Sequence, residues 1–596
     1  MPKFNERYVM IGLPGLVLAW SLGLGGLGKG ARGKQALAAV SVALLAAGFL
    51  WGDGNWYWNK AFTKDQWREA ARFVVGRVAA GETVVLVSGH AWPIWHYYAP
   101  DTPAVRAPDL EILNVDAVLD YADSAALLRA GLLGKSGAWL IGWQDEVVDP
   151  MHVVSLHLAQ AGLEAPTHRE FWGLTVRHFA QLDADAISPA IPNALDPPLS
   201  FGHQIDLLGH DVTPAGALLL FWQLHPGVDA LQADLHMVGE LTTVDGLPYA
   251  RLVDQRPTGY DFPTFRWQPR QIAVSQLAAP DWLGFDALPG AYQLRLGVYA
   301  PDGDPAGLDL LDATGAPHSK RALLNVAVEQ APAAAYELPR ESVPIPVSAT
   351  AVLDKETVEP GQPVDVAITW RLGQPLHEDA SLDVQWLNSD GSGIDRQTLP
   401  LWPAFPTSQW STDRFLRTVH RLRAPAHAEP GPAELALALS SAPQSVLRLP
   451  ITIAPSTRQF SAPPVVQALD ATWGDQIRLL GLRAPLPITI KAGSQLDIHA
   501  VWQAATRPAA DYTVTAQFLN GAGQPQSQVD LPLPDGSQNW LDGQIVEQML
   551  MLNAPDAPGK YRLIAALYNA NVPGQPRLQR VGGDDFVSLG EILVEE

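Results

Sequence analysis

The chain has 596 residues, of which 47% are apolar and only 17% charged, so a disordered chain is excluded and several folded domains are expected. Its 40 basic and 62 acidic residues give a net charge of −22, which argues against nucleic acid as a partner. The sequence contains no cysteine, which excludes disulfide scaffolds, thiolate metal sites and cysteine nucleophiles together.

Residues 1–52 are typical of a membrane anchor. Residues 8–27 form an uncharged run long enough to cross roughly 30 Å of hydrocarbon, and residues 36–51 form a second, shorter run. Three basic residues lie between the two runs: Lys29, Arg32 and Lys34. The positive-inside rule places this loop in the cytoplasm and residues 53–596 outside it. We therefore expect two transmembrane helices, a cell-membrane location and the lipid bilayer as a partner; a signal peptide is the alternative.

Residues 63–182 alternate expected helices and strands. Helices are expected near 67–78, 93–98, 124–133 and 150–161, and strands near 83–87, 138–142 and 171–178. This alternation indicates a small α/β domain with a mostly parallel sheet of three or four strands. Ser88 and His90 follow the first strand, where open α/β sheets bind ligands. No nucleophile elbow, phosphate loop or dinucleotide motif accompanies them, so we interpret the pair as a turn and assign no catalytic residue, metal ligand or cofactor.

Residues 200–596 repeat one pattern three times. Each copy has a strand that ends in Trp, a second Trp some forty residues later, and a Gly that opens another strand. The Trp-to-Trp spacings are 45, 40 and 38 residues, and a fixed order at similar intervals identifies a repeated domain. Alternating strands and turn signals predict immunoglobulin-like antiparallel β-sandwiches over residues 200–330, 347–454 and 466–596. Proline-rich linkers are expected over residues 189–198, 331–346 and 454–464.

The two tryptophans of each copy have different interpretations. The first ends an alternating strand, which predicts burial between sheets: Trp222, Trp370 and Trp502. The second lies in a connection, where exposure is more common: Trp267, Trp410 and Trp540. These three serve either as packing lids or as platforms on which the sugar rings of cell-surface glycans stack. The Asp-rich turns lack the spacing of known calcium loops, so no metal site is assigned.

Several short motifs occur in an order that resembles a known family. Glu6-Arg7-Tyr8 and an apolar span with Pro14 precede the segment KDQWREAARFV at residues 64–74, and Tyr97-Tyr98 and Asp149-Pro150 follow it. This order is similar to the C-terminal portion of bacterial GT-C class membrane glycosyltransferases. These are protein-mannosyltransferase-like enzymes that use polyprenyl-phosphate sugars, and some members have appended β-sandwich domains.

The resemblance implies that residues 53–596 are the extracytoplasmic region of a glycosyltransferase-like protein. It also implies that Arg7 and Tyr8 contact a lipid-linked phosphate. Family members carry an acidic catalytic residue among many more membrane helices than this chain has, so we expect the chain alone not to be catalytic and a separately encoded membrane core to be its partner. The alternative is a membrane-anchored cell-surface binding or spacer protein with weak glycan binding.

Overall fold

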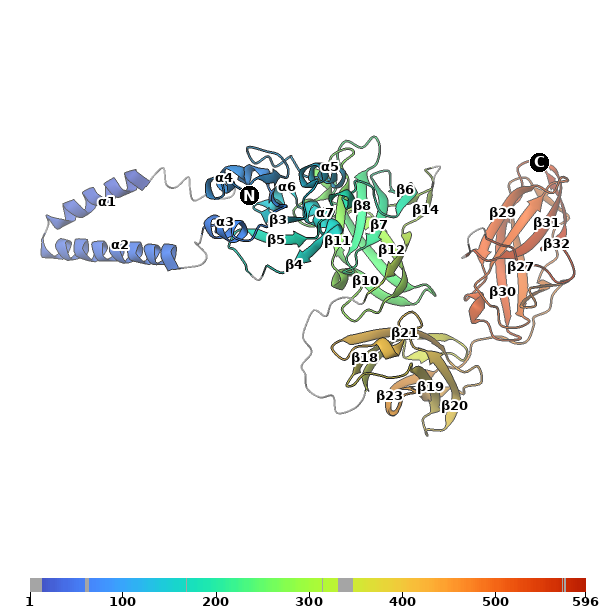
Figure 1. Cartoon of the computed structure of the whole chain (residues 1–596). Coiled ribbons are helices and arrows are strands. Elements are labelled where there is room, and N and C mark those ends of the chain that lie inside the picture. Colours follow the sequence, from blue (N-terminus) through green and yellow to red (C-terminus); the bar gives the residue numbers. More distant parts are fainter. Residues whose placement is uncertain are drawn as a thin grey trace.

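Figure 1 shows the computed structural model. It describes residues 13–29, 31–58, 64–167, 169–312, 315–330, 347–570, 572 and 575–596. Strands dominate and form several sandwich-like sheets, joined by a few helices. The chain is therefore a multidomain, β-rich protein with an apolar helix near its N-terminus, and the expected fold class is confirmed at this level.

Two helices at the N-terminal end stand apart from the body in Figure 1: α1 (Leu13–Gly28) and α2 (Arg32–Trp58). The segment Arg32–Asn55 is long and apolar enough to cross a membrane, and none of it is buried against protein. Large apolar side chains along it, such as Leu44 and Phe49, are exposed. Burial in lipid would remove this apolar surface from water. Among the described residues α2 is the only helix that meets this length, because the described part of α1 is shorter.

The next unit is a five-stranded sheet with helices around it. Its helices are α3 (Trp67–Val75), α4 (Trp92–Tyr98), α5 (Tyr121–Leu132), α6 (Asp145–Val148) and α7 (Val153–Ala161). Its strands are β1 (Glu82–Val87), β2 (Ala104–Arg106), β3 (Gly137–Gly142), β4 (Leu163–Ala165) and β5 (Thr175–Ala180). The sheet order is β2-β1-β3-β5-β4, in which β2, β1 and β3 are parallel and β5 is antiparallel to both of its neighbours, β3 and β4.

This sheet has more strands than the three or four expected. The two that sequence reasoning missed, β2 and β4, have three residues each, which is too short to show a period-two pattern. The final strand also lies later than expected, at Thr175–Ala180 rather than 171–178. The helices form because one face of each is apolar: in α3, Trp67, Ala70 and Val74 are buried, while Arg68 and Arg72 are exposed.

The remaining strands form three pairs of sheets. The first contains β6 (Ala194–Phe201), β7 (Ile205–Val212), β8 (Leu218–Leu224), β9 (His236–Thr243), β10 (Pro248–Gln255), β11 (Ala273–Leu277), β12 (Gly290–Tyr299), β13 (Leu310–Leu311), β14 (Pro317–Ser319) and β15 (Ala322–Val328), with the short helix α8 (Ala279–Trp282). The second contains β16 (Val347–Leu353), β17 (Thr357–Val358), β18 (Pro363–Leu372), β19 (Ser381–Asn388), β20 (Gly393–Pro400), β21 (Phe415–Arg423), β22 (Gly431–Leu439) and β23 (Ala442–Ile453). The third contains β24 (Gln467–Trp473), β25 (Ile477–Leu482), β26 (Thr489–Lys491), β27 (Gln495–Ala504), β28 (Thr513–Leu519), β29 (Pro525–Pro532), β30 (Ile545–Asn553), β31 (Gly559–Tyr568) and β32 (Phe586–Glu595).

The same strand order recurs in the three pairs. One sheet runs β10-β9-β12-β15 in the first pair, β20-β19-β22-β23 in the second and β29-β28-β31-β32 in the third. The opposite sheet runs β11-β8-β7-β6 in the first pair and β30-β27-β25-β24 in the third. The tryptophan spacing that indicates a repeat in the sequence therefore corresponds to a repeated topology.

A matching bulge in β7 and β25 extends this likeness to single residues. The register slips between Leu207 and Gly209 in β7 and between Leu479 and Gly481 in β25. Glycine is required at both positions: a Cβ at Gly209 would lie 2.5 Å from Cγ2 of Ile191, and one at Gly481 would overlap the Gln467 carbonyl. The shared sequence I-x-L-L-G therefore corresponds to one bulged strand in two copies.

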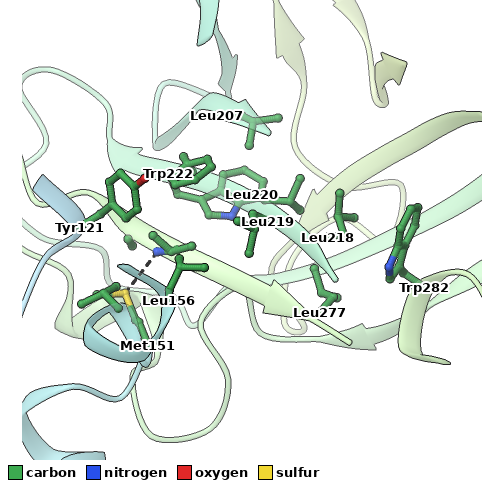
Figure 2. Packing of buried hydrophobic residues seen from close by; sticks show 14 of the residues in the cluster. Tyr121, Met151, Leu156, Leu207, Leu218, Leu219, Leu220, Trp222, Leu277 and Trp282 are labelled. Carbon is green, nitrogen blue, oxygen red and sulfur yellow. Dashed lines mark hydrogen bonds between the residues drawn. The ribbon is translucent and has the colours of Figure 1, made fainter. Parts of the chain in front are cut away.

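β8 is buried on both of its faces. Its Trp222 ring lies 6.0 Å from that of Phe201 between the sheets of the first pair, while the Phe221 ring points the other way and lies 4.9 Å from Tyr121 of α5. Figure 2 shows Leu219 on the side of Met151 and Leu156, which belong to the α/β unit. One hydrophobic core therefore runs from one face of the α/β sheet into the first sheet pair, whereas α3, α4 and the other face of that sheet enclose a separate core.

The expected linker over residues 189–198 packs against this core and leads directly into a strand. Ile187 is fully buried, Ile191 packs against the core, and β6 already begins at Ala194. The proline-rich composition was misleading because proline also occurs at irregularities within strands: Pro197 of β6 lies where the register with β7 shifts, between Ala194 and Leu199. The expected linker over residues 331–346 lies outside the described residues.

The first and second sheet pairs meet at a polar and aromatic junction. The guanidinium of Arg417 lies 2.5 Å from the Asp286 carboxylate and donates to the Tyr249 carbonyl oxygen at 2.9 Å. The Trp402 indole donates to the Pro289 carbonyl oxygen at 2.7 Å and its ring lies 5.7 Å from Tyr249. These contacts are specific in direction, so they fix how the two pairs meet.

The expected linker over residues 454–464 lies along the second junction. Thr457 donates to the Glu359 carboxylate of the second pair at 3.0 Å, and Arg458 donates to the Asn539 carbonyl oxygen of the third pair at 2.7 Å. The Gln459 carbonyl oxygen accepts from the Ile545 amide at 2.7 Å. The segment therefore contacts both neighbours.

The buried first tryptophans lead to a stability prediction. Trp370 is 3% exposed and donates to the Thr418 hydroxyl at 2.9 Å, so Trp370→Ala should lower the free energy of unfolding of the second sheet pair by about 3–5 kcal/mol. Scanning calorimetry of the full chain with hydrogen exchange resolved along β18 measures this loss. Phe460→Ala, at a half-exposed ring, should change it by less than about 0.5 kcal/mol. Equal losses in the two variants would contradict the core assignment.

Candidate functional site

A cavity of about 840 Å³ lies where the α/β unit meets the first sheet pair. Val87 and Gly142 line it from the carboxyl ends of β1 and β3, the edge at which open α/β sheets bind ligands. Thr213 and Ala217, from the turn between β7 and β8, line the opposite side. The cavity exists because the shared core holds these two units together.

Asp149 is the most strongly perturbed group in the cavity wall. It lies between α6 and α7, and its two carboxyl oxygens accept from the amides of Val153 at 2.7 Å and Val154 at 3.1 Å. Burial raises the pKa of Asp149 to about 8, with a further contribution from the nearby Asp145. The group is therefore mostly neutral at pH 7 and can offer an O–H to a ligand.

Arg177 and Glu164 form a neutral pair on another wall. Arg177 of β5 makes two parallel hydrogen bonds to the Glu164 carboxylate, both 2.7 Å long. This pairing lowers the pKa of Glu164 and occupies the only lysine or arginine that lines the cavity. Asp145 and Asp211 also line the cavity, and neither is paired with Arg177. The cavity therefore disfavours anions and fits a neutral or cationic small molecule with an apolar part.

Sequence reasoning missed this cavity. Its polar groups come from α6, β5 and the turn after β7, which are far apart in the chain, and no short motif joins them. The one local signal was Asp149-Pro150 beside the expected start of a helix, which indicates an N-terminal cap rather than a ligand site.

Ser88 and His90 do meet, at 2.6 Å between the hydroxyl oxygen and Nδ1. Ser88 is fully buried, and the His90 ring stacks on Trp143 at 4.9 Å. The third partner is the side chain of Gln144, not a carboxylate, and burial lowers the pKa of His90. A buried hydroxyl without an acid behind its histidine is not a nucleophile, so the pair fits the turn interpretation.

Ser200, Asp206 and His225 form another cluster of catalytic residue types. Both the Ser200 hydroxyl, at 3.2 Å, and the Asp206 carboxylate, at 2.9 Å, contact the same His225 atom, Nδ1. A triad needs the acid and the hydroxyl on opposite ring nitrogens. Among the described residues, no group of three His, Asp or Glu side chains has the geometry of a metal site.

The expected exposure of the second tryptophans is wrong. They are buried to about the same extent as the first set, with 2%, 2% and 0% of the residue exposed for Trp267, Trp410 and Trp540. Each indole donates a hydrogen bond of 2.8–3.0 Å, to the Thr258 hydroxyl, the Phe405 carbonyl and the Pro534 carbonyl respectively. A ring with no exposed face cannot stack on a sugar, so the glycan-platform interpretation fails for these three and the packing-lid interpretation fits them. Arg7 and Tyr8 lie outside the described residues.

A short helical turn orients each of these tryptophans. The turns are Thr264–Arg266, Thr407–Gln409 and Ser537–Asn539, and each ends at the tryptophan. The first residue of each turn is buried, and its hydroxyl oxygen accepts a hydrogen bond from the backbone amide of the residue that precedes the second strand of that sheet. The donors are Leu235 before β9 at 2.8 Å, Ala380 before β19 at 2.7 Å and Tyr512 before β28 at 2.9 Å. We call this arrangement the hydroxyl clamp. Thr-x-x-Trp or Ser-x-x-Trp was its sequence signal.

Comparisons with known proteins add little. No family model matches the chain, and no curated protein matches it. Among solved structures, a crystal structure of a Salmonella alpha-2-macroglobulin mutant is 14% identical with a TM-score of 0.14, covering 73% of this chain and 28% of the other. The native conformation of E. coli alpha-2-macroglobulin by cryo-electron microscopy is 11% identical with a TM-score of 0.18, covering 71% and 36%. The chain thus spans about a third of the length of these proteins, and similarity this low carries no inference about fold or function.

The hydroxyl clamp predicts a stability effect at Thr407. Thr407→Val keeps the shape but leaves the buried Ala380 amide unpaired, so it should destabilise the second sheet pair by about 1–3 kcal/mol. Hydrogen exchange of the full chain should show faster exchange at Ala380. Thr407→Ser keeps the hydroxyl and should retain most of the protection. Equal exchange rates at Ala380 in Thr407→Val and Thr407→Ser would show that the Thr407 hydroxyl does not stabilise the start of β19.

The raised pKa of Asp149 predicts a pH dependence of stability. The Asp149 carboxyl holds its proton up to about pH 8 in the folded chain, but only up to about pH 4 in the unfolded chain. Between these two pH values the folded state therefore becomes less stable as the pH rises. Outside them this group does not change the stability with pH. Asp149→Asn should remove this pH dependence from the variant, so the difference between variant and wild-type unfolding free energies, measured by urea titration at several pH values, should change steadily between about pH 4 and pH 8 in favour of the variant. Asp145→Asn should leave most of it. A difference curve for Asp149→Asn that is flat from pH 4 to pH 8 would contradict the prediction.

Proposed function

We propose that this chain is the membrane-anchored, extracytoplasmic part of a bacterial GT-C-type glycosyltransferase system, and that it binds and positions rather than catalyses. The observation that carries the proposal is α2, an apolar helix that contacts α1 but is not buried in protein, followed within a few residues by a large acidic body. In this proposal α1 and α2 both span the bilayer, with the basic loop in the cytoplasm and residues 53–596 outside. Arg7 and Tyr8 then lie near a lipid-linked phosphate.

The segment at residues 64–74 supports the link to glycosyltransferases. Packing accounts for its apolar positions, because Trp67, Ala70 and Val74 face the sheet. Packing does not account for Arg68 and Arg72, which are exposed. Arg68 belongs to the resembling motif, and in this proposal it is available for contact with a separately encoded membrane core.

The described residues favour a non-catalytic role. The two hydroxyl–histidine contacts described above lack the geometry of a nucleophile site, and the large cavity disfavours the anionic phosphate of a polyprenyl-phosphate sugar. In the finer version of this proposal the three sheet pairs are separate immunoglobulin-like domains over residues 200–330, 347–454 and 466–596. They project from the α/β domain of residues 63–182 and bind or position an acceptor.

A cell-surface binding or spacer protein is the second candidate. The three sheet pairs with defined junctions favour it, because such an arrangement sets a fixed reach from the membrane. Any glycan binding would then use neutral polar groups such as those of the cavity, not the buried tryptophans. Full chain reconstituted with polyprenyl-phosphate sugars should show no transfer in either case. Transfer that appears only on addition of a membrane core encoded in an adjacent reading frame would favour the first candidate.

The proposed topology has a direct test, because the chain has no native cysteine. Ile488→Cys, at an exposed side chain of the third sheet pair, should react with a membrane-impermeant maleimide in intact cells. Lys34→Cys, in the basic segment that begins α2, should react only after permeabilisation. Labelling of Lys34→Cys in intact cells with protection of Ile488→Cys would reverse the topology and contradict the proposal.

A further inference from the structure

One surface of the α/β unit combines exposed aromatic rings with positive charge. Tyr97 of α4 is 78% exposed and Trp172, before β5, is 50% exposed. Tyr97 belongs to α4, which packs against α3, and Trp172 hydrogen-bonds to Gln66, the residue before α3. We call this the anchor-side surface, and its residues are Arg68, Arg72, Trp92, Tyr97, Arg169 and Trp172.

The anchor-side surface lies beside the point where the chain leaves α2. The Trp172 amide donates to the Gln66 side chain at 3.0 Å, and the Trp172 carbonyl accepts from the Gln66 amide at 3.0 Å. The Trp143 indole donates to the Asp65 carboxylate at 2.7 Å. Asp65 is seven residues after Trp58, the end of α2, so it lies within about 25 Å of that end even if the connection is fully extended.

The segment that forms α3 has a net charge opposite in sign to that of the body as a whole. Residues 64–77 contain four basic and two acidic residues, a net charge of +2, whereas residues 53–596 contain 35 basic and 61 acidic residues, a net charge of −26. The guanidinium of Arg77 lies 3.9 Å from the Phe73 ring centroid, and that of Arg169 lies 5.6 Å from it. Such stacking covers the apolar ring while the charged ends stay accessible.

The geometry points to the headgroup region of the bilayer as the partner of the anchor-side surface. This inference rests on the proposed anchoring of α2. Trp and Tyr rings prefer the membrane–water interface, and arginine side chains attract anionic headgroups. The short connection keeps this surface within reach of the bilayer that holds α2. The rest of the acidic body is repelled by anionic lipid, so docking at this surface orients the three sheet pairs away from the membrane.

The test uses the full chain in vesicles of phosphatidylcholine with a minority of phosphatidylglycerol. A single cysteine replaces Tyr97, Leu44 in α2, or Ile488 in the third sheet pair, and each carries the same fluorophore. Nitroxide lipids labelled on the headgroup or on the acyl chain then quench the fluorophore by contact. All three positions are exposed, so the substitutions do not empty the core.

Headgroup nitroxide should quench the Tyr97→Cys label several-fold more than the Ile488→Cys label. In the Tyr97→Cys background, Arg68→Gln with Arg72→Gln, or removal of phosphatidylglycerol, should reduce this quenching. Acyl-chain nitroxide should quench Leu44→Cys whether or not the surface docks. Quenching at Leu44 with equal, low quenching at Tyr97 and Ile488 overturns the docking inference alone, whereas no quenching at Leu44 overturns the proposed anchoring.

Discussion

The two-sided burial of β8 is the constraint on which the rest of the body depends. An isolated sandwich needs an apolar residue only at alternate positions of a strand, yet this strand presents Leu219 and Phe221 to the α/β unit as well as Leu220 and Trp222 to its own sheet pair. The α/β unit and the first sheet pair therefore share a core on one face of the α/β sheet, so unfolding either unit removes apolar packing from the other, although the far face of that sheet has a core of its own. The cavity at the carboxyl ends of β1 and β3 is a product of this shared core, because the α/β unit supplies most of its wall and the first sheet pair supplies the rest.

The second and third sheet pairs are joined to the body in a different way. Their contacts with their neighbours are mainly directional hydrogen bonds and ion pairs, through Arg417 at one junction and Arg458 at the other. Each has its own core, although Val419 of the second pair reaches the core of the first. Such junctions set orientation more than they add stability, since half-exposed ion pairs contribute little to the free energy of unfolding.

Much of the architecture follows from local patterns in the sequence. Alternation along β18 and β27 predicts half-buried strands, and the regular tryptophan spacing predicts the repeat. The exposure of Trp410 and its counterparts could not be judged from their place in a connection, because the turn at Thr407 and a backbone acceptor direct the indole inward. The cavity could not be predicted either, since Asp149 and Arg177 come together only through sheet order. The strands β2 and β4 were too short to give a pattern.

The difference between a shared core and separate cores also bears on how the chain carries a mechanical load. If the C-terminal end is pulled while α2 is held, the tension passes through three sheet pairs in series. The second and third pairs have cores largely of their own, so each can open and lengthen the chain while losing mainly its junction contacts with its neighbours, and they act as extensible elements. The first pair cannot open without also breaking the packing of Phe221 on Tyr121, so force is passed through it to the α/β unit and the anchor. The shared strand thus makes the membrane-proximal half stiff and leaves extension to the distal half.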